Sequence, residues 1–268
     1  MTKYFWRFFL TTLFFFSLMF VLFDYGPVVR VPILQYERLQ SGGVTGSGWV
    51  SPRDFVNHIL YITNNKINVI PLKKIVKLYK KKKKLPSRTI ALTFDGSHDY
   101  LMDVVFNKLV KNKLPATFFI TTDLIGEEGY LSEEDLNTLR ESGLITIASN
   151  GIKENIDLTS ITVQDAYSQA YFSKTTLKSF VGVEIDYFSY PKGKFTPQVV
   201  NKIKEAGYKA AFASYLGSTK FKREKGVFWI ERTPIKDVDK RLLHLRFKCW
   251  GNYTILSAWF DKYIGKYF

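Results

Sequence analysis

The sequence predicts an α/β protein with a parallel sheet or barrel, and two observations support this prediction. Short apolar runs alternate along the chain with segments in which apolar residues recur every three to four positions, as expected for strands followed by helices. The chain has 268 residues, which suits one α/β domain of roughly 250 residues once an apolar N-terminal segment is set aside. We expect an N-terminal membrane anchor at residues 1–25 and one domain at residues 26–268.

The clearest strand–loop–helix–strand unit begins at Thr89. The apolar run Thr89–Phe94 ends in a carboxylate, Asp95, and a turn, a helical pattern and a second apolar run from Ala116 follow. Catalytic groups of α/β folds lie at the carboxyl ends of buried parallel strands, so Asp95 is a candidate catalytic residue. A local interpretation stays open, in which Asp95 caps the next helix or stabilises the turn.

Strands and helices are expected in alternation along the rest of the chain. Strands are predicted at Val31–Tyr36, Asn68–Ile70, Ile145–Ala148, Tyr187–Tyr190, Lys209–Ser214 and Val227–Thr233. Helices are predicted after Ser51, over Leu72–Lys84, and after the capping residues Ser132, Thr162 and Thr196.

The N-terminal segment has the length and flanking charges of a single transmembrane helix. Phe5–Phe23 is nearly continuous apolar sequence, close to the roughly 20 residues that span a bilayer. Lys3 and Arg7 precede it, so the positive-inside rule places the N-terminus in the cytoplasm and the main domain outside. No small-residue cleavage site follows, which favours an uncleaved signal anchor over the alternative of a cleaved signal peptide.

The charge balance favours anionic partners. The net charge is +15, which suits phospholipid head groups or acidic envelope polymers, and no nucleic-acid motif is present. A lysine run ends the helix predicted over Leu72–Lys84: Lys80, Lys81, Lys82, Lys83 and Lys84. This run is either a solvated helix end or a contact with membrane lipid beside the anchor. A single cysteine, Cys249, excludes an intrachain disulfide and a cysteine-based metal site.

Several segments together resemble the polysaccharide deacetylases of the NodB type, carbohydrate esterase family four. In that family a strand ending Thr-Phe-Asp-Asp-Gly is followed one helix later by Pro-Ala-Thr-Phe-Phe. The matching segments here are the strand ending at Asp95, Pro115–Phe119, Phe188–Gly193, Ala206–Phe212 and Trp229–Ile235. The resemblance covers Val31 to about Ile235. It implies a distorted parallel (β/α) barrel and hydrolysis of the amide bond of N-acetylated amino-sugar glycans in the cell envelope.

The resemblance also assigns roles to individual positions. Family members use the first Asp as a base, hold a metal ion with the second Asp and two His, and take an acid from a late Leu-His pair. Asp95 matches the base and His244 the acid, whereas Gly96 stands at the metal-binding Asp. Asn150 and Glu154 stand at the two His positions. We therefore expect none of the family metal ligands, and no cofactor. A hard divalent cation held by Asp95, Glu154, His98, Asp99 and Glu37 stays an alternative.

The third family motif is partly retained. Tyr190 and Pro191 keep their places, Lys192 replaces an aromatic residue, and Ser189 replaces an Arg that orients the base in some members. With Asn150 and Glu154, the residues Tyr190, Pro191 and Lys192 are expected to bind the glycan. Two functions follow: an N-deacetylase with an altered site, or an inactive glycan-binding or scaffold pseudo-enzyme in an envelope polymer complex.

Overall fold

The computed structural model describes residues 6–15, 32–39, 49–81, 86, 88–214, 226–240 and 242–249, and it divides into units at residues 1–30 and 31–268. In the first unit, residues 6–15 form a helix whose side chains are all exposed. No helix in the described ranges is long and apolar enough to cross a membrane. Residues 1–5 and 16–25 of the predicted anchor lie outside these ranges, as do Lys82, Lys83 and Lys84.

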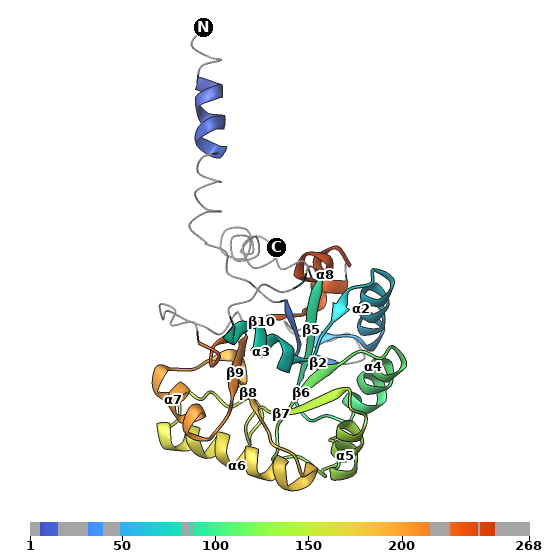
Figure 1. The fold of residues 1–268 in the computed structure, drawn as a ribbon, viewed down its shortest axis with the longest axis vertical. Coiled ribbons are helices and arrows are strands. Elements are labelled where there is room, and N and C mark those ends of the chain that lie inside the picture. The colour runs from blue at the N-terminus through green and yellow to red at the C-terminus, as the bar shows by residue number, and fades with distance from the viewer. Residues whose placement is uncertain are drawn as a thin grey trace. The chain divides into compact units, whose positions relative to one another are not determined.

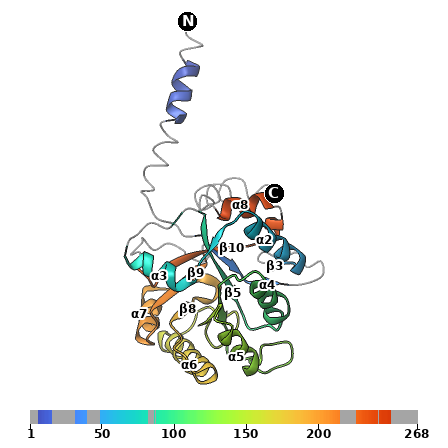
Figure 2. The same ribbon diagram turned by 45° about the vertical axis from the view of Figure 1, so that its right-hand side comes forward.

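The second unit is a closed parallel barrel (Figures 1 and 2). Going round the barrel, the strands are β1 (Ile33–Tyr36), β5 (Thr89–Asp95), β6 (Ala116–Ile120), β7 (Ile145–Ser149), β8 (Tyr187–Ser189), β9 (Ala210–Ser214) and β10 (Ile230–Pro234). Closure occurs at β1, which pairs with β5 on one side and with β10 on the other. The pairing is thinnest between β7 and β8, which share one registered pair, Ser149 and Phe188. The barrel prediction is confirmed.

Two further strand pairings lie outside the closed ring. β4 (Asn68–Val69) pairs with the first two residues of β5, and β1 pairs with β5 from Ala91 onwards. The short strands β2 (Arg38–Leu39) and β3 (Trp49–Val50) form a separate parallel pair just after β1. The sequence did not predict this small sheet because two-residue strands carry no periodicity.

Helices cover the barrel between successive strands (Figure 1). They are α2 (Pro52–Asn64), α3 (Leu72–Lys80), the π-helix η1 (Leu101–Phe106) continuing into α4 (Asn107–Lys111), α5 (Glu133–Glu141), α6 (Val163–Val181), α7 (Pro197–Glu205) and α8 (Leu242–Cys249), with short 3₁₀ turns η2 (Pro191–Gly193) and η3 (Asp237–Lys240). The predicted N-caps Ser51, Ser132, Thr162 and Thr196 each accept a backbone N–H of the first helical turn. The helix predicted to reach Lys84 ends at Lys80.

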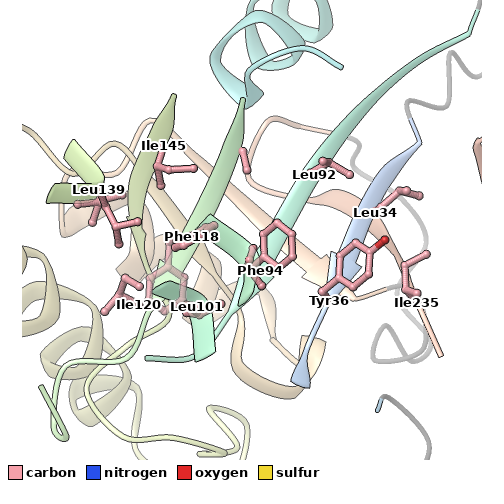
Figure 3. Close-up of a cluster of buried hydrophobic side chains, with 14 of the residues drawn as sticks. Leu34, Tyr36, Leu92, Phe94, Leu101, Phe118, Ile120, Leu139, Ile145 and Ile235 are labelled. Carbon is pink, nitrogen blue, oxygen red and sulfur yellow. The ribbon is translucent and has the colours of Figure 1, made fainter. Parts of the chain in front are cut away.

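Alternate residues of each strand face the helices or the barrel interior. The outward layer, shown in Figure 3, packs strand residues such as Leu92, Phe94 and Phe118 against helix residues such as Leu101 and Leu139. The inward cluster draws on every barrel strand: Ile33, Ala91, Phe119, Ala148, Tyr187, Ala210, Phe212 and Ile230. Side chains of α3 belong to the same inward cluster, so α3 covers the barrel end opposite the carboxyl ends of the strands.

The interior becomes polar towards the carboxyl ends of the strands. With the same inward alternation come Gln35 on β1, Thr93 and Asp95 on β5, Ser189 on β8 and Arg232 on β10. All of these side chains except Asp95 are buried, and the Asp95 side chain is only 12% exposed. The fold therefore brings its polar interior groups together at one end of the barrel, around Asp95.

Candidate functional site at the carboxyl ends of the strands

The Asp95 carboxylate is held by side chains from two other strands. Arg232 donates from Nη1 to Oδ1 over 2.6 Å and from Nη2 to Oδ2 over 2.8 Å. Gln35 Nε2 donates to the same Oδ2 over 2.8 Å. The Asp95 side chain is 12% exposed. Three hydrogen bonds from β10 and β1 thus fix the carboxylate and leave about one of its four acceptor positions unused.

Arg232 lies within the barrel and has no exposed side-chain surface. Its Nη2 also donates to Ser189 Oγ over 2.7 Å, and its guanidinium lies 4.8 Å from the centre of the Phe119 ring. Ser189 stands where the resemblance expects an arginine. In this chain the guanidinium that contacts both Asp95 and Ser189 belongs to Arg232, on β10.

A second carboxylate, Glu37, adjoins Asp95. Gln35 Nε2 donates to Glu37 Oε1 over 3.2 Å as well as to Asp95, so one amide group bridges the two carboxylates. Burial, reinforced by the negative charge of Asp95, raises the pKa of Glu37 above its usual value. Glu37 therefore takes up a proton at a higher pH than an ordinary glutamate, beside an Asp95 that is held by a cation.

Glu154 is joined to two basic side chains at the rim of the site. Arg38 Nη2 donates to Glu154 Oε1 over 3.0 Å, and His98 Nε2 lies 3.7 Å from the same oxygen. The His98 ring stacks on Tyr130 at 4.6 Å and on Tyr100 at 5.4 Å between centroids. His98 is thus part of a half-buried aromatic cluster.

The residues present do not fit the metal ion that the fold family implies. Gly96 supplies no ligand, and its φ of +102° disfavours any residue with a side chain at that position. Asn150 is 9% exposed; its Nδ2 donates to Thr121 Oγ1 over 3.4 Å, and its Oδ1 is buried without a partner. Within the described ranges, no group of three or more His, Cys, Asp and Glu side chains could hold a metal ion.

Of the three binding residues predicted from the third family motif, two are buried and one is exposed. Tyr190 is 1% exposed, stacks on Phe195 at 4.4 Å and donates to the Phe228 carbonyl oxygen over 3.0 Å. Its ring therefore packs within the core and offers no exposed face to a glycan. Pro191 is buried and Lys192 is exposed on the turn η2.

His244, the predicted acid, lies on α8, which packs against α2. Its Nδ1 is buried without a hydrogen-bond partner. Among the described residues, no recorded contact joins His244 to Asp95. Catalysis by either residue, and glycan binding by the others, stay predictions.

Comparison with known proteins identifies the family of this fold and site. Residues 82–211 match the family model described as polysaccharide deacetylase. This matched region belongs to the polysaccharide deacetylase family. This span contains Asp95 and every barrel strand from β5 to β8, and it also contains the Gly96, Asn150 and Glu154 positions discussed above.

Curated polysaccharide deacetylase relatives are distant. YxkH of Bacillus subtilis is 23% identical over 77% of this chain and 71% of its own length. Poly-beta-1,6-N-acetyl-D-glucosamine N-deacetylase of Staphylococcus aureus is 26% identical over 61% of this chain. The chain spans only 60% of the length of that staphylococcal relative.

Solved structures share the fold at low sequence identity. The Streptococcus pyogenes deacetylase PplD, in complex with acetate, superposes with a TM-score of 0.70 at 16% identity, over 80% of this chain and 96% of that one. A polysaccharide deacetylase from Bacillus cereus gives a TM-score of 0.65 at 22% identity, over 77% of this chain and 65% of that one. These matches establish the NodB-type barrel.

The sequence analysis missed three residues of the site, although one left a signal. Arg232 is a charged residue in a strand of a parallel barrel, where both faces are buried and apolar side chains are the rule. Such a residue indicates an interior partner. Gln35 and Arg38 left no comparable signal, because a polar residue near a strand end is common.

Proposed function

We propose that this protein binds an N-acetylated amino-sugar glycan of the cell envelope at the carboxyl ends of its barrel strands, and hydrolyses the amide bond slowly or not at all. Membership of the polysaccharide deacetylase family supports the class of ligand. The name of the staphylococcal relative, which acts on poly-beta-1,6-N-acetyl-D-glucosamine, supplies a specific probe.

One observation supports slow hydrolysis above all: the positions at which the family holds its metal ion carry Gly96, Asn150 and Glu154 in this chain. A carboxylate that removes a proton from water needs a free lone pair and, in metal-dependent hydrolysis, a water made acidic by the metal. Here Asp95 accepts three hydrogen bonds, two of them from a buried guanidinium. The neighbouring positions offer a glycine at 96, an amide at Asn150 and a carboxylate at Glu154 that is joined to Arg38. We derive no step through a metal ion.

The alternative is an active N-deacetylase in which Asp95 is the base. The Glu37–Asp95 pair supports it, since two adjacent carboxyl groups with different surroundings can serve as acid and base. In that reaction water would lose a proton to Asp95 while its oxygen bonds to the amide carbon. Glu37 would then protonate the leaving amine as the C–N bond breaks, giving acetate and a free amino sugar.

Binding and acetate release by the full-length chain separate these functions. We expect β-1,6-linked N-acetyl-D-glucosamine oligomers to bind in isothermal titration, with Asp95→Asn changing the affinity only modestly. Elemental analysis is expected to find no stoichiometric zinc. If the oligomers do not bind, the proposed function is wrong; if wild type releases acetate at ordinary enzymatic rates and Asp95→Asn does not, the alternative holds.

We also propose that the N-terminal segment anchors the protein in a membrane. The apolar run Phe5–Phe23 and the preceding Lys3 and Arg7 support a single-pass orientation with the barrel outside the cytoplasm. Protease added to spheroplasts should then digest the barrel domain. A domain that is cut only after lysis would contradict this orientation.

A further inference from the structure

Two arginines lie near Asp95, and only one of them is available to a ligand. Arg232 is buried, and its guanidinium is engaged by Asp95 and Ser189. The side chain of Arg38, by contrast, is 33% exposed. A guanidinium has several N–H donors in a planar fork, and Glu154 accepts from one nitrogen, Nη2. Arg38 therefore presents donors that a bound molecule can reach.

Arg38 is held in place from two sides. Its guanidinium lies 5.3 Å from the centre of the Trp49 ring and 3.0 Å, through Nη2, from Glu154 Oε1. The small sheet places Trp49 beside Arg38, because the two residues are registered partners of β2 and β3. His98 Nε2 lies 3.7 Å from the same Glu154 oxygen. A cation positioned in advance loses little conformational entropy when a ligand binds.

Arg38 and Asp95 belong to one site. Gln35 Nε2 donates both to Asp95 and to Glu37, and Arg38 directly follows Glu37 in the chain. His98, which lies on the loop just after Asp95, is 3.7 Å from the Glu154 oxygen that accepts from Arg38. The charges of Asp95 and Arg38 also both influence the pKa of Glu37. The strand end thus carries a fixed, half-exposed cation close to the Asp95–Glu37 pair.

We propose that Arg38 binds the acetamido carbonyl oxygen of the glycan, with Glu154 and His98 positioning its guanidinium. This inference rests on the proposed function and deepens it by naming the group that recognises the N-acetyl substituent. A carbonyl oxygen accepts hydrogen bonds but donates none, so a pure donor such as guanidinium is its natural partner. A charged donor makes this bond stronger than a neutral one would. The recognition needs no metal ion.

The test compares two neutral glycans and two arginine variants, with a chelator present throughout. The ligands are a β-1,6-linked N-acetyl-D-glucosamine oligomer and the glucose oligomer of the same length and linkage, which has a hydroxyl group in place of each acetamido group. The variants of the full-length chain are Arg38→Gln and the matched control Arg140→Gln. Arg140 is also a partly exposed arginine, at 36%, whose Nη2 pairs with a glutamate at 2.7 Å, but it lies on α5.

Wild type and Arg140→Gln are expected to prefer the acetylated oligomer. Arg38→Gln should bind it about tenfold more weakly or worse, as expected for loss of a charged hydrogen bond, and should lose the preference. Unchanged binding by Arg38→Gln would overturn the inference and leave the proposed function standing. A wild type that binds both oligomers equally would also overturn it, and a wild type that binds neither would refute the proposed function itself.

Thermal unfolding of each variant checks that it folds. If Arg38→Gln does not fold, Arg38→Met takes its place, because its unbranched stem retains the packing against Trp49. The wild-type preference between the two oligomers tests the inference even without any variant.

Discussion

Replacing Arg232 with methionine tests the buried contact that defines the site. The change removes two hydrogen bonds to Asp95, one to Ser189 and a longer one to Thr93, and leaves the Asp95 carboxylate with Gln35. Breaking a buried ion pair by removing one partner costs about 3–5 kcal/mol. We expect the lower end, about 3 kcal/mol, because Asp95 is 12% exposed and keeps one donor.

Urea unfolding followed by circular dichroism measures this loss. The change in the free energy of unfolding is compared with that of Arg140→Met, where a partly exposed pair is removed and about 1 kcal/mol or less is expected. Adding Asp95→Asn to Arg232→Met should cost less than the sum of the two single changes, because the second removes a carboxylate already left without its cation. A loss below about 1 kcal/mol for Arg232→Met would refute the claim that this pair holds three strands together.

Two further predictions concern pH. The pKa of Glu37 is raised in the folded chain, so the ionised form of Glu37 at neutral pH reduces the free energy of unfolding. Glu37→Gln should therefore raise the melting temperature at pH 7. The gain should shrink as the pH falls towards about 4, because Glu37 is then protonated in the wild type as well. The same change at exposed Glu128 should have little effect at either pH. The pKa of Asp157 is lowered to about 2 by hydrogen bonds from Lys194 and Thr159. Its contribution should be complete above about pH 4 and lost as the pH falls through about 2, so Asp157→Asn should cost about 1 kcal/mol or less at pH 7 and progressively less as the pH falls from 4 through 2.

The barrel could be predicted from the sequence because its signals are local. The apolar runs that became β5 and β6 were bounded by turn residues, and the helix starts carried N-caps such as Ser132 and Thr162. Strand ends were displaced by a few residues, as for β10, which begins at Ile230 instead of Val227. Boundaries depend on pairing with neighbouring strands, which local pattern does not contain.

The site could be predicted only in part, because its contacts join distant positions. Asp95 was identified from its place at a strand end. Its partner Arg232 lies 137 positions away, and Arg38 and Glu154 are separated by 116 positions. No local pattern links such residues; the barrel brings them together only when β10 and β1 have closed the ring.

The resemblance located the positions of Asn150 and Glu154 but not their partners. A residue carried over by position inherits a place in the fold, and its chemistry then depends on which side chains surround it. Glu154 illustrates this, since it stands at a predicted metal-ligand position and pairs with Arg38 and His98.

Acetate release from a β-1,6-linked N-acetyl-D-glucosamine oligomer by the full-length chain tests the central claim most directly. The claim is that the strand-end site binds the N-acetyl group without efficient amide hydrolysis. We expect saturable binding with acetate release far below the ordinary enzymatic range of about 1–10³ s⁻¹. Turnover within that range, abolished both by Asp95→Asn and by a chelator, would contradict the claim and make Asp95 the base of a metal-dependent deacetylase.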